Sequence, residues 1–60
     1  SDHSLELFNP SRITIKGMSM AMKGNSVQIN GRETKNRKVS GDEIIFWFDL
    51  RPQECVTIDW

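Results

Sequence analysis

The sequence predicts a small all-β domain, a barrel or sandwich of about six short antiparallel strands, comparable in size to SH3 and OB domains. Three observations carry this prediction. Apolar and polar residues alternate with a period of two along most of the chain, as in strands with one buried face. Residues that favour turns recur at short intervals between the alternating segments. The length of 60 residues allows one small domain, so we expect residues 1–60 to form a single unit.

Three alternating segments fill the first part of the chain. Residues 5–7 alternate and end at the turn sequence Asn9-Pro10-Ser11, where proline lacks an N–H and fixes φ. Residues 12–16 predict a second strand. After Gly17, residues 18–23 predict a third strand, in which every second residue is a methionine.

Turns divide the middle of the chain. Gly24-Asn25 is a turn signal, and Val27 and Ile29 alternate after it. Asn30-Gly31 is a strong hairpin signal because both residues tolerate positive φ. The polar residues 32–39 then predict the return strand of this hairpin, which ends at the next turn, residues 40–42.

The segment 43–51 is compatible with either a helix or a strand. Ser40 and Glu43 have the spacing of a helix capping box, and Pro52 would end a helix. The residues between them are mostly β-branched or aromatic, which favours a strand. We therefore predict a strand here. We predict one for 18–23 as well, because a helix that short is unstable. Residues 56–60 alternate and form the last predicted strand.

The strand from Ile44 to Phe48 is apolar on both faces. Ile44, Phe46 and Phe48 point one way, while Ile45 and Trp47 point the other, so both faces require cover. Another subunit or a ligand would cover the second face. Alternatively, a terminal segment or the aliphatic stems of basic side chains fold over Trp47. Ile45 and Trp47 are accordingly our candidate oligomer interface.

The net charge of zero conceals a segregation of charge along the chain. Residues 12–38 hold seven basic residues and one acid, so this segment carries +6. Residues 39–60 hold one basic residue and five acids, which gives −4, and residues 1–11 hold two acids. An asymmetry of this kind bears on the choice of binding partners.

The densest basic stretch, residues 32–38, predicts a surface that contacts phosphates, because lysine and arginine neutralise them and release counterions. Trp47 adds a face on which a base can stack. Two other interpretations remain open. The charges keep an edge strand soluble, or they dock on the acidic tail of a neighbouring subunit. The candidate nucleic-acid-binding residues are Arg32, Lys35, Arg37, Lys38 and Trp47.

Catalytic and metal sites find little support in the sequence. His3 is the only histidine and has no evident partner for acid–base chemistry. Cys55 lies between acids in sequence, which oppose a reactive thiolate, so we interpret it as structural. No recognisable ligand spacing predicts a metal, and we expect no cofactor and no enzymatic activity.

Residues 27–32 and 39–44 have the shape VxINGx followed by VxGDEI. This shape resembles the terminal hairpin of S4-type RNA-binding domains, and also part of forkhead-associated phosphopeptide-binding domains. An S4 module presents basic helices before the hairpin, whereas residues 12–23 predict strands here. We interpret the resemblance as shared turn chemistry.

The sequence therefore predicts a non-enzymatic binding module that contacts nucleic acid or an acidic protein surface through the basic 32–38 hairpin. The alternative is a protein-interaction or homo-oligomeric module that uses the 44–48 strand and the acidic C-terminal half. A third hypothesis is a small inhibitor or antitoxin-like partner. No segment is apolar for long enough to span a membrane, so we expect no membrane partner. A single cysteine suits a reducing compartment, and we expect a cytoplasmic protein.

Overall fold

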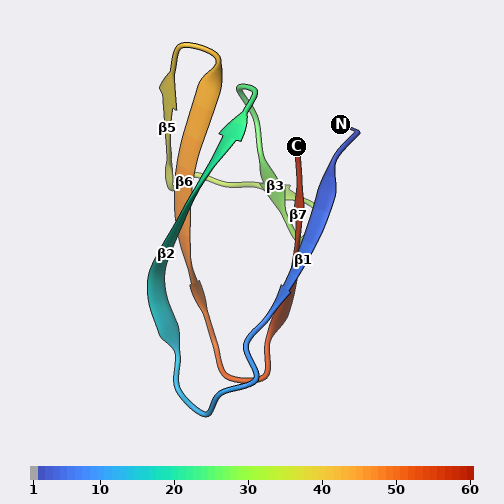
Figure 1. Ribbon diagram of the computed structural model, residues 1–60, viewed down its shortest axis with the longest axis vertical. Coiled ribbons are helices and arrows are strands. Elements are labelled where there is room, and N and C mark those ends of the chain that lie inside the picture. Colours follow the sequence, from blue (N-terminus) through green and yellow to red (C-terminus); the bar gives the residue numbers. More distant parts are fainter. Residues whose placement is uncertain (1) are drawn as a thin grey trace.

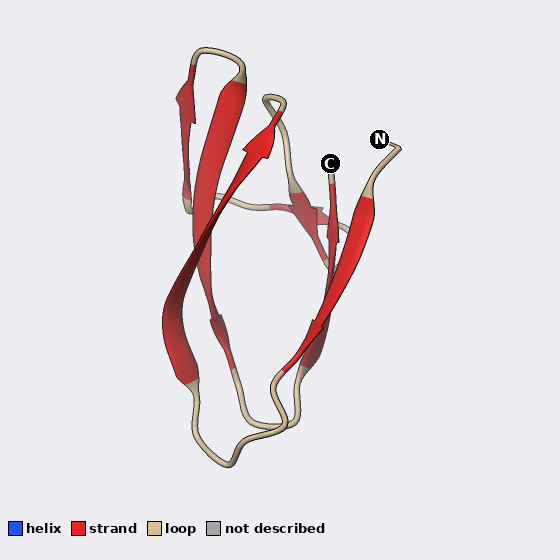
Figure 2. Ribbon diagram, viewed as in Figure 1, coloured by secondary structure: helices blue, strands red, loops and turns tan. Residues whose placement is uncertain are grey.

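The computed structural model describes residues 2–60, which form seven strands in two antiparallel sheets (Figures 1 and 2). One sheet has four strands in the order β1-β7-β3-β4, and the other has three in the order β2-β6-β5. The strands are β1 (Ser4–Phe8), β2 (Ile15–Lys23), β3 (Gln28–Ile29), β4 (Arg32–Glu33), β5 (Arg37–Ser40), β6 (Glu43–Leu50) and β7 (Cys55–Asp59).

The all-β prediction is confirmed. The two sheets described do not join into a closed barrel, so the sandwich is the better of the two predicted architectures. Both helical alternatives are wrong, because β6 covers residues 43–50 and β2 covers residues 15–23. In β6 the run of β-branched and aromatic side chains outweighs the capping-box spacing, as their strand preference suggests.

The core lies between the sheets and is formed by the inward residues of alternating strands. Ile44 and Phe46 of β6 meet Val56 and Ile58 of β7, and all four side chains are buried. The predicted orientation of β6 is correct on this side, since Phe48 stacks on Phe46 with ring centroids 6.0 Å apart. Val27 and Leu50 complete the buried apolar set.

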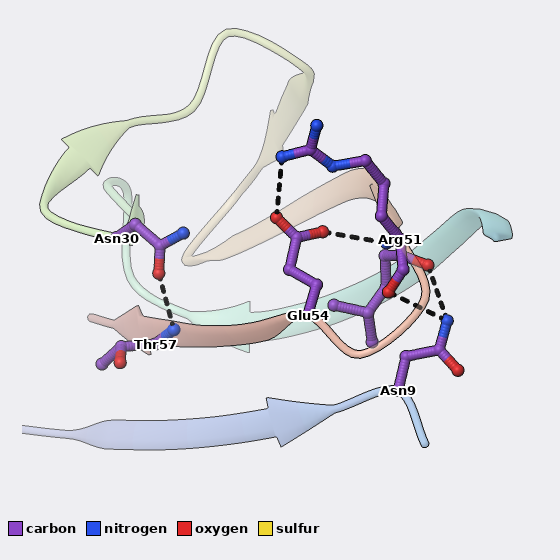
Figure 3. Close-up of polar contacts among 6 residues, drawn as sticks. Asn9, Asn30, Arg51, Glu54 and Thr57 are labelled. Carbon is purple, nitrogen blue, oxygen red and sulfur yellow. Dashed lines mark hydrogen bonds and ion pairs between the residues drawn. The ribbon is translucent and has the colours of Figure 1, made fainter. Parts of the chain in front are cut away.

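The Asn30-Gly31 turn forms as predicted. Ile29 and Arg32 pair directly across it, and both turn residues have positive φ, 52° and 80°. Asn30 also extends the ladder towards β7. Its N–H donates to the Thr57 carbonyl over 2.8 Å. Its side-chain Oδ1 accepts the Thr57 N–H over 2.9 Å (Figure 3).

The two strands expected at 12–16 and 18–23 are one bulged strand. Lys16 and Gly17 lie opposite the single residue Asp49, and Gly17 takes a left-handed φ of 62°. The Asp49 carboxylate accepts the Gly17 N–H over 2.9 Å. The glycine therefore marks a bulge in β2, and Ile13 lies outside the strand with 72% of its surface exposed.

The expected return strand at 32–39 is also wrong. Its start, β4, pairs with β3 in the four-stranded sheet, whereas its end, β5, pairs with β6 in the other sheet. Residues 34–36 carry the chain from one sheet to the other. Only the first two residues after the Asn30-Gly31 turn thus belong to the predicted hairpin, and the basic stretch is divided between the two layers.

The β1–β2 and β6–β7 loops lie together at one end of the sandwich, at the bottom of Figure 1. Asn9 of the β1–β2 loop closes this end, and its side chain is fully buried. Its Nδ2 donates to the carbonyls of Ile13, Leu50 and Arg51 over 2.9, 3.0 and 3.1 Å (Figure 3 shows the last two). Its Oδ1 accepts the N–H and the hydroxyl of Ser11. A single amide thus ties the β1–β2 loop to the end of β6.

Candidate nucleic-acid interface

The outer face of the β2-β6-β5 sheet is defined by the strand register, because residues directly opposite each other in antiparallel strands share a face. On β6 this face carries Glu43, Ile45 and Trp47. The register of the two strand pairs gives this face three rows of neighbours: Ser19 and Trp47; Ala21, Ile45 and Lys38; and Lys23, Glu43 and Ser40. Asn36, the residue before β5, continues the first row, because the Trp47 N–H donates to its carbonyl over 3.1 Å.

Trp47 lies open on this face, with 41% of its surface exposed, and Ile45 beside it is half-buried. The residues that flank them on β2 are Ser19 and Ala21, whose short side chains leave the indole uncovered. Of the covers considered from the sequence, neither a terminal segment nor the basic stems enclose Trp47. The result is an aromatic and aliphatic surface framed by polar side chains.

The charge segregation along the chain becomes a segregation between the two sheets. Strands β2, β5 and β6 contain four basic residues (Lys16, Lys23, Arg37 and Lys38) and two acids (Glu43 and Asp49). The strands of the other sheet contain one basic residue (Arg32) and three acids (Glu6, Glu33 and Asp59). The sheet that exposes Trp47 is therefore the positive one.

The structure brings together some of the residues singled out from the sequence and separates others. Lys38, Ile45 and Trp47 share the outer face, with Lys38 directly opposite Ile45. Arg32 lies on β4 in the other sheet. Lys35 is exposed in the crossing segment.

Arg37 lies opposite Phe46 and so belongs to the other face of β5; its guanidinium donates to the Thr34 carbonyl over 2.7 Å. Sequence reasoning missed Ser19 and Lys23 as members of the outer face. Alternation assigns a residue to one side of its own strand, but only the pairing of β2 with β6 and of β6 with β5 shows which strands lie side by side.

The remaining chemical candidates lie away from this face. The His3 ring stacks on Trp60 with centroids 5.3 Å apart and an angle of 12° between the ring planes. Cys55 is exposed, and its Sγ lies 3.9 Å from Oε2 of Glu6. Residues 2–60 contain no group of three His, Cys, Asp or Glu side chains placed to hold a metal ion.

One carboxyl group has a shifted pKa. The Arg51 N–H donates to Oε1 of Glu54 over 2.8 Å, and the Arg51 guanidinium lies 3.4 Å from Oε2 (Figure 3). Both contacts favour the charged carboxylate and lower the pKa of Glu54, the backbone hydrogen bond most strongly. This pair stabilises the turn between β6 and β7, at the end of the sandwich opposite the β5–β6 turn (Figure 1).

Two cavities, of about 320 and 460 Å³, border the turn at residues 23–25, at one end of β2. Trp47 lines neither of them. The chemistry available at Trp47 is therefore that of an open sheet surface: stacking on the indole, apolar contact with Ile45, and charge or hydrogen bonding from the surrounding polar groups.

No family model, curated protein or solved structure matches the chain. Within residues 2–60 there is no helix with the length and apolar character needed to cross a membrane.

Proposed function

We propose that this protein is a non-enzymatic binding module that takes single-stranded nucleic acid on the outer face of the β2-β6-β5 sheet. The observation that supports it best is the position of Trp47: a partly exposed indole on the central strand of the positive sheet, one row away from Lys38. Arg32, the one basic residue in the strands of the other sheet, is not part of this surface.

The indole supplies the sequence-independent part of the affinity. Stacking of a base on an aromatic side chain contributes about 1–3 kcal/mol by alanine substitution. Stacking requires an unpaired base whose ring face is free, which a duplex does not offer. A sheet surface with an open tryptophan therefore suits a single strand rather than a double helix.

Lysines on both sides of β6 suit the backbone of such a strand. Lys38 on β5 and Lys23 on β2 are exposed and lie in adjacent rows of the face. Each lysine that neutralises a phosphate releases counterions, so binding becomes weaker as salt is raised. Glu43 lies between the two strands in the row of Lys23, which confines the phosphate path to the Lys38 side.

Short polar side chains frame the indole. Ser19 lies opposite Trp47 on β2, and Asn36 lies on the other side, where its carbonyl accepts the Trp47 N–H. Their amide and hydroxyl groups both donate and accept hydrogen bonds, as the edges of a stacked base require. The surface thus combines the three contacts of a single-strand site: stacking, phosphate neutralisation and hydrogen bonding.

A fluorescence titration with a short oligothymidylate tests this proposal. Trp60→Phe leaves Trp47 as the only tryptophan and keeps an aromatic ring beside His3. In this background the oligonucleotide is expected to quench the emission of Trp47 to saturation. The logarithm of the binding constant is expected to fall with the logarithm of the salt concentration, by about 0.7 for each phosphate contact.

Two matched substitutions locate the surface. Lys38→Ala is expected to reduce the salt slope by about one contact, whereas Arg32→Ala, on the other sheet, leaves both slope and affinity unchanged. Trp47→Leu is expected to weaken binding about tenfold or more, because the stacking is lost. Binding of this variant is measured by sedimentation. Absence of binding at low salt, or equal effects of Lys38→Ala and Arg32→Ala, contradicts the proposal.

One observation favours a second function. Trp47, Ile45 and Ala21 form a continuous apolar path across the face, which also suits a second copy or another protein. On that hypothesis Ile45 and Trp47 are a subunit contact, and Trp47→Ser lowers the mass in solution. A mass that Trp47→Ser does not change excludes this role for the face.

A further inference from the structure

The four edge strands of the two sheets differ in how well they are protected from pairing. β4 has only two residues, β1 has five, and the four-residue β5 begins with Arg37 and Lys38. Short length and charged side chains both discourage the addition of another strand. β2 is different, since it has nine residues, and those from Gly17 to Met22 carry no charge.

The backbone groups on the free side of β2 can be identified from its neighbours. The Gly24 N–H donates to the Asp42 carbonyl across the β2–β6 pair, and the Trp47 N–H donates to Asn36 across the β5–β6 pair. The N–H and C=O groups of successive residues point to opposite sides of an antiparallel strand. The backbone groups of the even-numbered residues of β2 therefore point towards β6. The N–H and C=O of Ser19 and Ala21 therefore point to the free edge.

The methionines of β2 are incompletely covered. Met18, Met20 and Met22 point towards the core and pack against it, yet each is only partly buried. They lie on the strand at the edge of its sheet, so no further strand of the same sheet covers them. A strand added beside β2 with apolar residues on the same face would bury more of their surface.

A second β2 fits this edge in one favoured antiparallel register. With Met20 opposite Met20 of the second copy, Met18 meets Met22 and Met22 meets Met18, so all three methionines of each strand are paired. Ser19 then lies opposite Ala21, and Lys23 opposite Gly17, so no like charges face each other. The outward-pointing groups of Ser19 and Ala21 are in the positions that exchange hydrogen bonds in this register.

We propose that two copies of this protein associate through antiparallel pairing of their β2 strands, centred on Met20. The two three-stranded sheets become one six-stranded sheet, in the order β5-β6-β2-β2-β6-β5. Its outer face carries two copies of Trp47 on a continuous surface. The association itself does not depend on the nucleic-acid proposal, and it is tested without nucleic acid.

A contact between two single strands is small, so we expect the association to be weak and to depend on protein concentration. Sedimentation equilibrium over a range of concentrations up to about 1 mM measures it. The mass is expected to rise from 6.9 kDa towards twice that value. A mass of 6.9 kDa at every concentration overturns the proposal.

Ala21→Pro tests the edge itself. Because the Ala21 N–H points away from β6, proline at this position removes no hydrogen bond within one copy, and edge strands tolerate it. The variant is expected to remain at 6.9 kDa. The control Ala21→Thr keeps the N–H and the strand preference and is expected to associate as the wild type does. A dimer that survives Ala21→Pro overturns the proposal.

Two double variants with charged residues at positions 19 and 21 test the register. They also test the edge if Ala21→Pro does not fold. Ser19→Lys with Ala21→Lys places lysines directly opposite each other across the contact and is expected to abolish association. Ser19→Lys with Ala21→Glu places opposite charges there and is expected to restore it. Equal masses for the two double variants exclude the Met20-centred register and overturn the proposal.

Discussion

Replacement of Asn9 by alanine is expected to destabilise the fold far more than a loop substitution normally does. Its side-chain amide faces the carbonyls of Ile13, Leu50 and Arg51, and the bond to Leu50 is buried. Alanine removes the amide donor of the buried hydrogen bond to the Leu50 carbonyl, a loss of about 1–3 kcal/mol. The bonds to the two partly buried carbonyls add about 1 kcal/mol, because water replaces them in part.

The expected loss of about 2–4 kcal/mol is large for a chain of this size. At roughly 0.05–0.15 kcal/mol per residue, a domain of this length has a total stability of about 3–9 kcal/mol. A loss of 1 kcal/mol lowers the Tm of a domain of 60 to 100 residues by about 4–8 °C. Asn9→Ala is therefore expected to lower the Tm by at least about 8 °C.

Urea unfolding followed by tryptophan fluorescence measures the effect. Ser11→Ala is the matched control, because it removes a hydroxyl from the same cluster but leaves the Asn9 amide in place. We expect it to cost about 1 kcal/mol or less. An Asn9→Ala protein within about 0.5 kcal/mol of the wild type would refute the assignment of Asn9 as the group that closes this end of the sandwich.

Three further predictions concern charge, backbone conformation and packing. Arg51 lowers the pKa of Glu54 in the folded protein. The contribution of this carboxylate to stability is therefore present above the ordinary glutamate pKa and is lost as pH falls through the folded pKa. Urea midpoints measured across this acidic range should fall less in Glu54→Gln than in the wild type. Gly31→Ala places a side chain at φ 80° in open space, so a loss of about 1 kcal/mol is expected from backbone strain alone, and an unchanged thermal midpoint would contradict it. Phe46→Ala removes a fully buried ring and is expected to cost about 3–5 kcal/mol, enough to unfold much of the protein at 25 °C, so a native circular dichroism spectrum with an unshifted urea midpoint would count against its place at the centre of the core.

Sequence patterns predicted the local structure well where a single strand or turn decides the outcome. The alternation in β6 correctly placed Ile44 and Phe46 towards the core and Trp47 on the opposite face. The Asn30-Gly31 turn formed because both residues accept positive φ. These features depend on backbone preferences and on the side-chain period of two, both of which are visible in the sequence.

The errors arose where distant segments decide the structure. Gly17 resembles a strand terminator in the sequence, yet the Asp49 carboxylate 32 residues away accepts its N–H and holds it in a bulge. Asn9 resembles an ordinary turn residue, although its amide bonds are mostly made to residues beyond position 40 or at the far side of its loop. Neither contact has a local signal.

The candidate site was predictable only in part for the same reason. Lys38 and Trp47 were both identified, and they lie on one face because β5 pairs with β6. The division of residues 32–38 between the sheets was not predicted, since a polar segment without apolar alternation does not show where one strand ends and the next begins. Arg32 and Lys38, six positions apart, consequently belong to different sheets.

Chemical-shift mapping of the backbone and indole N–H groups with a short single-stranded oligonucleotide tests the central claim most directly. The outer face of the β2-β6-β5 sheet is expected to respond, with the largest changes at the Trp47 indole, Asn36 and Lys38, and with little change at Glu6 and Thr57 on the opposite sheet. An unchanged spectrum at low salt, or changes concentrated on the opposite sheet, would contradict the account.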